Sequence, residues 1–99
     1  MDEKHLRGNL SEIIALKWLT QQGYVVYTKM GVQSPFDLVA YDPREEKILL
    51  VDVKTAAKRR SEFQHGTTIR RVKNDRQKTL GVVFLYVYLD EEEKCELIL

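Results

Sequence analysis

Residues 82–89 (VVFLYVYL) limit the possible folds more than any other segment. All eight are apolar, and β-branched and aromatic side chains predominate, which is typical of a strand buried on both faces of a sheet. The run is far too short to span a bilayer. A chain of 99 residues also has the length of one domain, which is about 100–200 residues. We therefore expect residues 1–99 to fold as a single domain around this strand.

Apolar residues at helical spacing predict two helices. In the first fifth of the chain they are Leu6, Leu10, Ile13, Ile14, Leu16, Trp18 and Leu19. This helix should end near Gln22, with Gly23 as its C-terminal stop. A 3-4-4 spacing predicts a second helix over Ile69–Leu80, with Thr68 as its cap and Gly81 as its stop.

Four further segments have the composition of strands: Tyr24–Met30, Asp37–Tyr41, Ile48–Lys54 and Cys95–Leu99. Pro43 and the charged residues around it indicate a hairpin turn between the second and third of these segments. Residues 56–68 lack periodicity and are expected to form a mobile basic loop. The element order αβββαββ predicts an α/β (α+β) fold, with helices flanking a small mixed sheet.

The charge is unevenly distributed along the chain. The net charge is only +1, but residues 58–78 contain eight Lys and Arg against two acids, which leaves −5 for the rest. Such a basic segment is typical of a surface that binds a polyanion such as nucleic acid, although a solvated helix face explains it equally well.

Cysteine content and the N-terminus exclude some classes of protein. Cys95 is the only cysteine, so there is no internal disulfide framework and no Cys-based zinc cluster. The N-terminus Met1-Asp2-Glu3-Lys4 has no signal-peptide core. We therefore expect a soluble cytoplasmic protein with no membrane partner.

The register of the predicted hairpin brings two aspartates together. If Tyr41 pairs with Ile48 across the turn, Asp37 lies opposite Asp52. Directly opposed residues project from the same face with Cβ atoms about 5 Å apart, where like charges destabilise a sheet. Lys54 lies two residues beyond Asp52 and projects from that face as well. The sequence thus predicts two carboxylates and an ammonium group at one corner of the sheet.

A divalent cation would offset the repulsion between these carboxylates. Mg²⁺ prefers oxygen ligands and binds one or two carboxylates together with phosphate and water. The bound metal polarises a phosphodiester, and a nearby lysine can hold the attacking water. The alternative is structural: Asp37 caps a loop, and Asp52 and Lys54 form an exposed strand pair. Asp52 interrupts the apolar run ILLV-V, where an unpaired acid is costly to bury, and this favours the metal site.

Glu12 is a fourth candidate. On a helical wheel it shares a sector with Gly8 and Leu19, so it leans toward the apolar face. Gly8, one turn earlier, would let another backbone or a phosphate approach closely. Asn9–Glu12 also matches a capping box, in which Glu12 would only close a helix start. The spacing does not decide between these two roles.

Three sequence elements together resemble the PD-(D/E)XK nuclease superfamily. They are Gly8-xxx-Glu12 on the first helix, Pro35-Phe-Asp37 and Asp52-Val-Lys54-Thr55. The resemblance is closest to the branch that holds archaeal Holliday junction resolvases and the group I intron homing endonucleases of the same fold. It implies a restriction-endonuclease-like domain.

The resemblance also implies roles for individual residues. Asp37 and Asp52 would bind the metal, Glu12 would contact it directly or through water, and Lys54 would be the catalytic lysine. Ser34 matches a loop serine of the resolvases. Contacts to the DNA backbone would come from the basic residues Lys58, Arg59, Arg60, Arg70, Arg71 and Lys73.

The sequence therefore predicts a Mg²⁺-dependent DNA endonuclease in which Mn²⁺ can substitute. Reading bases in the grooves would need more chain than a nuclease core provides. We accordingly expect a homodimer that recognises branched DNA by shape and phosphate contacts, as a Holliday junction resolvase does. The alternatives are a homing-type, restriction or repair endonuclease, and a nucleic-acid-binding module without catalysis.

Overall fold

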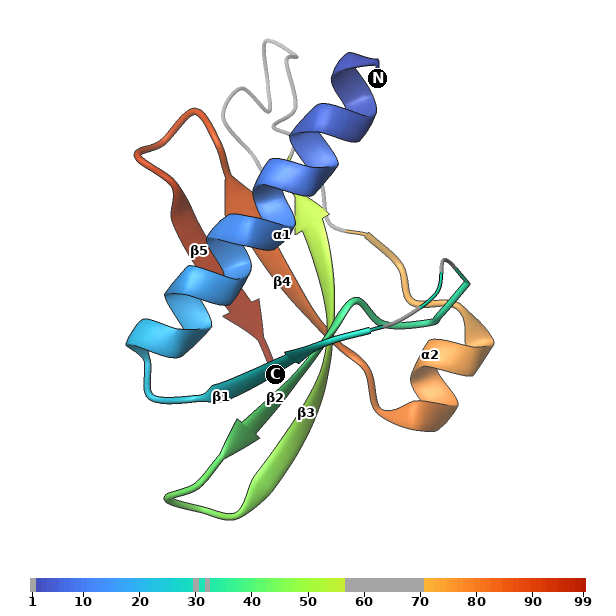
Figure 1. The fold of residues 1–99 in the computed structure, drawn as a ribbon. Coiled ribbons are helices and arrows are strands. Elements are labelled where there is room, and N and C mark those ends of the chain that lie inside the picture. The colour runs from blue at the N-terminus through green and yellow to red at the C-terminus, as the bar shows by residue number, and fades with distance from the viewer. Residues whose placement is uncertain (1, 30, 32, 57–70) are drawn as a thin grey trace, which may run out of the picture.

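The computed structural model describes residues 2–29, 31, 33–56 and 71–99. Figure 1 shows the predicted order αβββαββ as an α+β fold. The elements are α1 (Glu3–Gln21), β1 (Val25–Thr28), β2 (Leu38–Asp42), β3 (Lys47–Thr55), α2 (Asp75–Leu80), β4 (Val83–Tyr88) and β5 (Lys94–Ile98).

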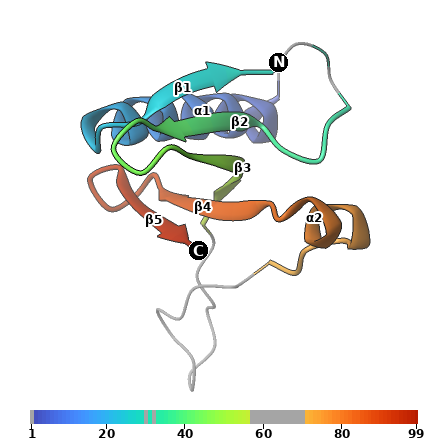
Figure 2. The same ribbon diagram turned by 90° about the horizontal axis from the view of Figure 1, so that it is seen from below.

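The five strands form one mixed sheet in the order β1-β2-β3-β4-β5. Neighbouring strands are antiparallel except for β3 and β4, which run parallel. A parallel pair needs a long connection between its strands, and the segment between β3 and β4 includes α2. The helix α1 lies along one face of the sheet, where it contacts β3, β1 and β4. In Figure 2, α2 lies beyond one end of β4.

The predicted hairpin register is confirmed. Tyr41 pairs with Ile48, and the ladder runs on to Leu38 opposite Val51. The turn is shorter than expected because Asp42 and Lys47 also pair. The side chain of Asp42 accepts a hydrogen bond from the backbone N–H of Arg44 at 2.9 Å, which stabilises the turn.

The first helix packs its apolar face on the sheet. Ile14, Ala15 and Leu19 are buried against residues of β2, β3 and β4, including Val51 and Leu85. The helix begins earlier than the capping-box interpretation requires, because the Asp2 side chain accepts from the backbone N–H of His5 as the N-cap. Asn9–Glu12 therefore lies inside the helix, and the proposal that Glu12 closes a helix start is wrong.

The second helix is shorter than predicted. It begins at Asp75 rather than Ile69, because Asn74 is its N-cap and forms a capping box with Gln77. The backbone N–H of Arg71 instead donates to the hydroxyl of Tyr86 at 2.6 Å, which anchors the chain ahead of the helix. Gly81 ends the helix with a left-handed conformation (φ 69°), as predicted. Thr68 and Ile69 lie outside the described residues.

The apolar run of residues 82–89 forms the buried strand β4, as predicted. Leu85 and Val87 pack on the α1 side, whereas Phe84, Tyr86 and Tyr88 form a second cluster. Because these side chains are already buried within the described chain, the run is part of the core. No helix in the described part of the chain is long and apolar enough to cross a membrane.

Candidate functional site

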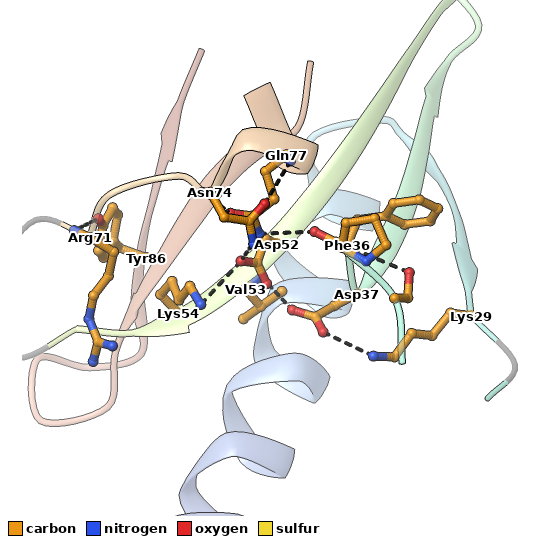
Figure 3. A network of polar contacts seen from close by, with 12 residues as sticks. Lys29, Phe36, Asp37, Asp52, Val53, Lys54, Arg71, Asn74, Gln77 and Tyr86 are labelled. Carbon is orange, nitrogen blue, oxygen red and sulfur yellow. Dashed lines mark hydrogen bonds and ion pairs between the residues drawn. The ribbon is translucent and has the colours of Figure 1, made fainter. Parts of the chain in front are cut away.

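Asp37 lies where β2 begins to pair with β3. Its backbone N–H donates to the carbonyl oxygen of Val51 at 2.8 Å. Its carboxylate Oδ2 accepts the backbone N–H of Val53 at 2.7 Å, a donor that the end of the ladder would otherwise leave without a partner. These two bonds fix the Asp37 side chain beside the middle of β3 (Figure 3).

Asp52 is buried at the same place on β3, with 8% of its surface exposed. Burial, and then hydrogen bonding with the Asp37 carboxyl, raises the pKa of Asp52 to about 6. The neighbouring Lys54 ammonium opposes this rise. Two carboxylates thus share one partly dehydrated site, as the hairpin register predicts, and the neighbouring Asp37 carboxyl disfavours ionisation of Asp52.

Lys54 lies on the same face as Asp52. Its Nζ is 3.2 Å from Asp52 Oδ2 and 5.5 Å from the centroid of the Phe84 ring. Lys73 approaches the same ring, with its Nζ at 5.9 Å from the centroid. The aromatic ring therefore lies close to two ammonium groups beside the carboxylates.

Glu12 reaches the site from α1. It lines a depression of about 230 Å³ together with Lys29, Asp37 and Leu38. Burial raises the pKa of Glu12, and the Asp37 carboxylate adds to the rise, while Lys29 lowers it. The structure thus brings Glu12 close to Asp37.

Lys29 is a site residue that the sequence analysis missed. Its Nζ lies 3.4 Å from Asp37 Oδ1. Thr28, the last residue of β1, pairs with Leu38, so the residue that follows β1 comes level with Asp37. The long loop between β1 and β2 gives no register from sequence, and only the β1–β2 ladder reveals this neighbour.

Gln77 is a second site residue that was not assigned from the sequence. Its side-chain Nε2 donates to Asp52 Oδ2 at 2.8 Å and to the carbonyl oxygen of Pro35 at 3.0 Å. Its Oε1 accepts the backbone N–H of Asn74 at 3.1 Å. One buried amide therefore joins α2, the loop before Asp37 and the buried carboxylate. The capping-box pattern Asn74-xx-Gln77 was the signal available in the sequence.

Replacing Gln77 by Leu should destabilise the fold by about 2–3 kcal/mol, because it removes three hydrogen bonds, one of them to the buried Asp52 carboxylate. Chemical denaturation monitored by circular dichroism measures this loss. Gln21→Leu makes the same change at an exposed position near the end of α1 and should shift stability by less than about 0.5 kcal/mol. Equal stability of the two variants would refute this role of Gln77.

The remaining predicted residues lie around this cluster or outside the described chain. The Ser34 hydroxyl accepts the backbone N–H of Phe36 at 3.3 Å, so it shapes the loop that leads to Asp37. Arg71 is exposed and Lys73 half-buried. Four of the predicted DNA contacts lie outside the described residues: Lys58, Arg59, Arg60 and Arg70.

The donor set fits a hard divalent cation. Asp37 and Asp52 offer carboxylate oxygens, and the raised pKa of Asp52 indicates a buried negative charge that the protein compensates only in part. No group of three or more His, Cys, Asp or Glu in the described ranges converges closely enough to hold a metal ion. Two carboxylates completed by water and phosphate are the ligands typical of Mg²⁺.

A comparison with protein families identifies the class of protein to which the chain belongs. The family model described as PD-(D/E)XK endonuclease matches residues 1–98. The chain therefore belongs to the PD-(D/E)XK endonuclease family.

Two particular proteins are similar to the chain. Protein 5.3 of Escherichia phage T7 is 43% identical over 56 residues, which are 57% of this chain and 46% of that protein. The solved structure of the bacterial homing endonuclease I-Ssp6803I aligns with a TM-score of 0.66 at 23% identity. That alignment covers 99% of this chain and 66% of the other, and it supports the fold. The chain thus spans less than two thirds of each relative.

Proposed function

We propose that the protein is a divalent-metal-dependent DNA endonuclease that hydrolyses phosphodiester bonds. Its active-site residues would be Asp37, Asp52 and Lys54. The main support is the meeting of two carboxylates and an ammonium group on one face of β3, with Lys54 Nζ 3.2 Å from Asp52 Oδ2. Membership of the endonuclease family supports the reaction class. Mg²⁺ is the proposed ion, with Mn²⁺ as a substitute.

The chain's residues divide the work of the reaction. Asp37 and Asp52 would hold the ion, which when bound polarises the phosphodiester and lowers the pKa of the attacking water. Glu12 would contribute through a water molecule from the α1 side. Lys54 would orient the attacking water and stabilise the charge that develops on the phosphate. Gln77 would keep the Asp52 carboxylate oriented.

Branched DNA is the proposed substrate, and a homodimer is the proposed assembly. Recognition through shape and phosphate contacts needs basic side chains near the carboxylates, and Arg71 and Lys73 lie there. Two copies would supply one site for each of the two strands cut at a Holliday junction. The second candidate is cleavage of linear duplex, favoured by the likeness to a homing endonuclease.

Cleavage of three labelled DNAs distinguishes these candidates: a four-way junction, a linear duplex and a single strand, each with Mg²⁺, Mn²⁺ or EDTA. We expect metal-dependent nicks paired symmetrically on the junction and little cleavage of the other two. Cleavage of linear duplex at fixed positions would contradict the resolvase proposal and support the homing-type alternative. Binding without cleavage in any metal would leave a nucleic-acid-binding module.

A further inference from the structure

A second hollow includes Lys54 in its lining. It is a groove of about 640 Å³ between the first half of α1 and the C-terminal end of β3. Its basic lining comes from Lys4 and Arg7 on α1, from Lys54 on β3 and from Arg71 ahead of α2. The groove therefore shares Lys54 with the carboxylate site, so anything bound along it lies next to the reacting position.

The charge of the groove is net positive. Four basic side chains face two acids, Asp2 and Glu3. The Asp2 carboxylate is already engaged at the helix start, where it accepts the backbone N–H of His5 at 2.9 Å and lies 3.0 Å from the His5 ring. A groove lined by one dominant sign of charge concentrates ligands of the opposite sign.

Both walls of the groove are fixed to the sheet. The hydroxyl groups of Ser11 on α1 and Thr55 on β3 are hydrogen-bonded at 2.6 Å, and Ser11 is buried. The backbone N–H of Arg71 is held by the hydroxyl of the buried Tyr86. In Figure 3, Arg71 and Lys54 lie on the same side of the Asp52 carboxylate. The basic groups are thus presented on a preformed surface.

Gly8 lies on the α1 wall of this groove, inside a 19-residue helix. A glycine inside a helix costs about 0.5–1 kcal/mol relative to alanine. A Cβ at Gly8 would meet nothing within 4 Å, and its backbone is not in the left-handed region. Neither packing nor conformation within the described chain requires glycine here, whereas a ligand that approaches the helix closely would require it.

We propose that this groove holds the sugar–phosphate backbone of the DNA strand immediately next to the phosphodiester that is cut. Arg7 and Arg71 contact its phosphates, and Gly8 leaves the space that the backbone occupies against α1. The inference rests on the proposed function, since it assigns the path of the strand relative to Asp52 and Lys54. Four residues of α1, about 6 Å along the helix axis, separate Gly8 in this groove from Glu12 in the depression that Asp37 lines.

Binding in EDTA tests the basic contacts without cleavage. Fluorescence anisotropy of a labelled junction, measured over a range of salt concentrations, should show weaker binding for Arg7→Gln and Arg71→Gln. Each variant should also lower the slope of log K against log salt by about 0.9, the value for one lost phosphate contact. Lys17→Gln makes the same charge change on α1 beside Trp18 and Gln21, away from the groove, and should leave the slope unchanged.

Gly8→Ala and Gly8→Gln test the space in the groove. Both variants should melt at or above the temperature of the wild type, because the added Cβ meets no atom within 4 Å and both residues favour a helix more than glycine does. We expect Gly8→Ala to lower the affinity for the junction about 3-fold, which corresponds to about 0.7 kcal/mol of binding free energy. Gly8→Gln should lower it more than 10-fold, which corresponds to more than about 1.4 kcal/mol. A well-folded Gly8→Gln variant that binds and cleaves like the wild type would overturn the proposal.

The two proposals fail in distinguishable ways. In one outcome, the wild type cleaves no DNA, and the Gly8 and Arg variants bind DNA more weakly than the wild type does. This result would support the groove and refute the nuclease activity. Normal binding and cleavage by all the groove variants would refute the groove while the nuclease activity stands.

Discussion

Asp52→Asn should abolish DNA cleavage, with a rate at least about 10³-fold below that of the wild type, because the loss of a metal-binding carboxylate removes several kcal/mol of transition-state stabilisation. Asparagine has nearly the same shape, and its side-chain oxygen can still accept the hydrogen bond from Gln77. Binding to DNA in EDTA should therefore remain within about 3-fold of the wild-type affinity, a difference below 1 kcal/mol.

Thermal melting shows whether the effect of Asp52→Asn is local. In EDTA the variant should melt at or above the wild-type temperature, since Asp52 is buried and its pKa is raised. Added Mg²⁺ should raise the melting temperature of the wild type and not that of the variant, because only the wild type binds the ion in its folded state. Asp90→Asn, in the exposed turn before β5, should cleave DNA and respond to Mg²⁺ as the wild type does.

The raised pKa of Asp52 also predicts a pH dependence of stability in EDTA. Between the unfolded-state pKa of about 3.9 and the folded value of about 6, the folded protein binds more protons at this group than the unfolded chain does. The free energy of unfolding should therefore fall as the pH rises through this range, by at most about 3 kcal/mol. Asp52→Asn should remove this part of the dependence, and urea denaturation at pH 4 and pH 7 measures it. An Asp52→Asn variant with the same pH dependence as the wild type would contradict the assignment.

Lys54→Met should lower the cleavage rate about 10²–10⁴-fold. Methionine keeps an unbranched apolar stem next to the Phe84 ring but cannot orient water or stabilise charge on the phosphate. The response of the melting temperature to Mg²⁺ should persist, because both carboxylates remain. A normal rate for this variant would exclude a catalytic role for Lys54, and loss of the Mg²⁺ response would make it a structural residue of the metal site.

Lys47 provides the matched control for this substitution. It lies at the other end of β3, and its only ion pair among the described residues is with Glu45 at 3.5 Å, where both side chains are mostly exposed. Exposed pairs of this kind contribute about 0–1 kcal/mol. Lys47→Met should leave both the cleavage rate and the response of the melting temperature to Mg²⁺ unchanged. Since both variants lose one positive charge, a slower rate for Lys54→Met alone would show that the position of the ammonium group matters.

The hairpin carried enough local information for its register to be predicted. The turn around Pro43 fixes how Tyr41 meets Ile48, and strand alternation then places Asp37, Asp52 and Lys54 at one corner. These relations involve neighbours across a short turn, so they follow from sequence distance alone. The buried strand β4 was predictable for a similar reason, since its uniform apolarity is a property of one short segment.

The second helix shows where such local reasoning fails. The apolar spacing that predicted a start at Ile69 includes Val72, which is 86% exposed and lies outside the core that the pattern implied. The start is set by Asn74, whose side chain accepts the backbone N–H of Gln77 at 2.8 Å. Asn9-xx-Glu12 has the same capping pattern but lies inside α1, since Asp2 caps that helix earlier. The pattern alone does not distinguish a helix start from a helix interior.

Lys29 and Gln77 depended on contacts between distant segments. Lys29 meets Asp37 through the β1–β2 ladder, and Gln77 reaches Asp52 across 25 residues of sequence. No turn fixes either relation, because the connections are long and the phase of α2 follows only from its cap. The meeting of the two aspartates was predictable, whereas the contacts that Lys29 and Gln77 make with them required the tertiary structure.

Dependence of cleavage on divalent metal tests the central claim most directly. DNA that the wild-type protein cuts should be cleaved in Mg²⁺ or Mn²⁺, left intact in EDTA, and cleaved again when excess Mg²⁺ is added to the chelated sample. Asp52→Asn should remain inactive at every metal concentration. Equal cleavage in EDTA and in Mg²⁺, or no cleavage of any DNA by the wild type in any metal, would contradict the account.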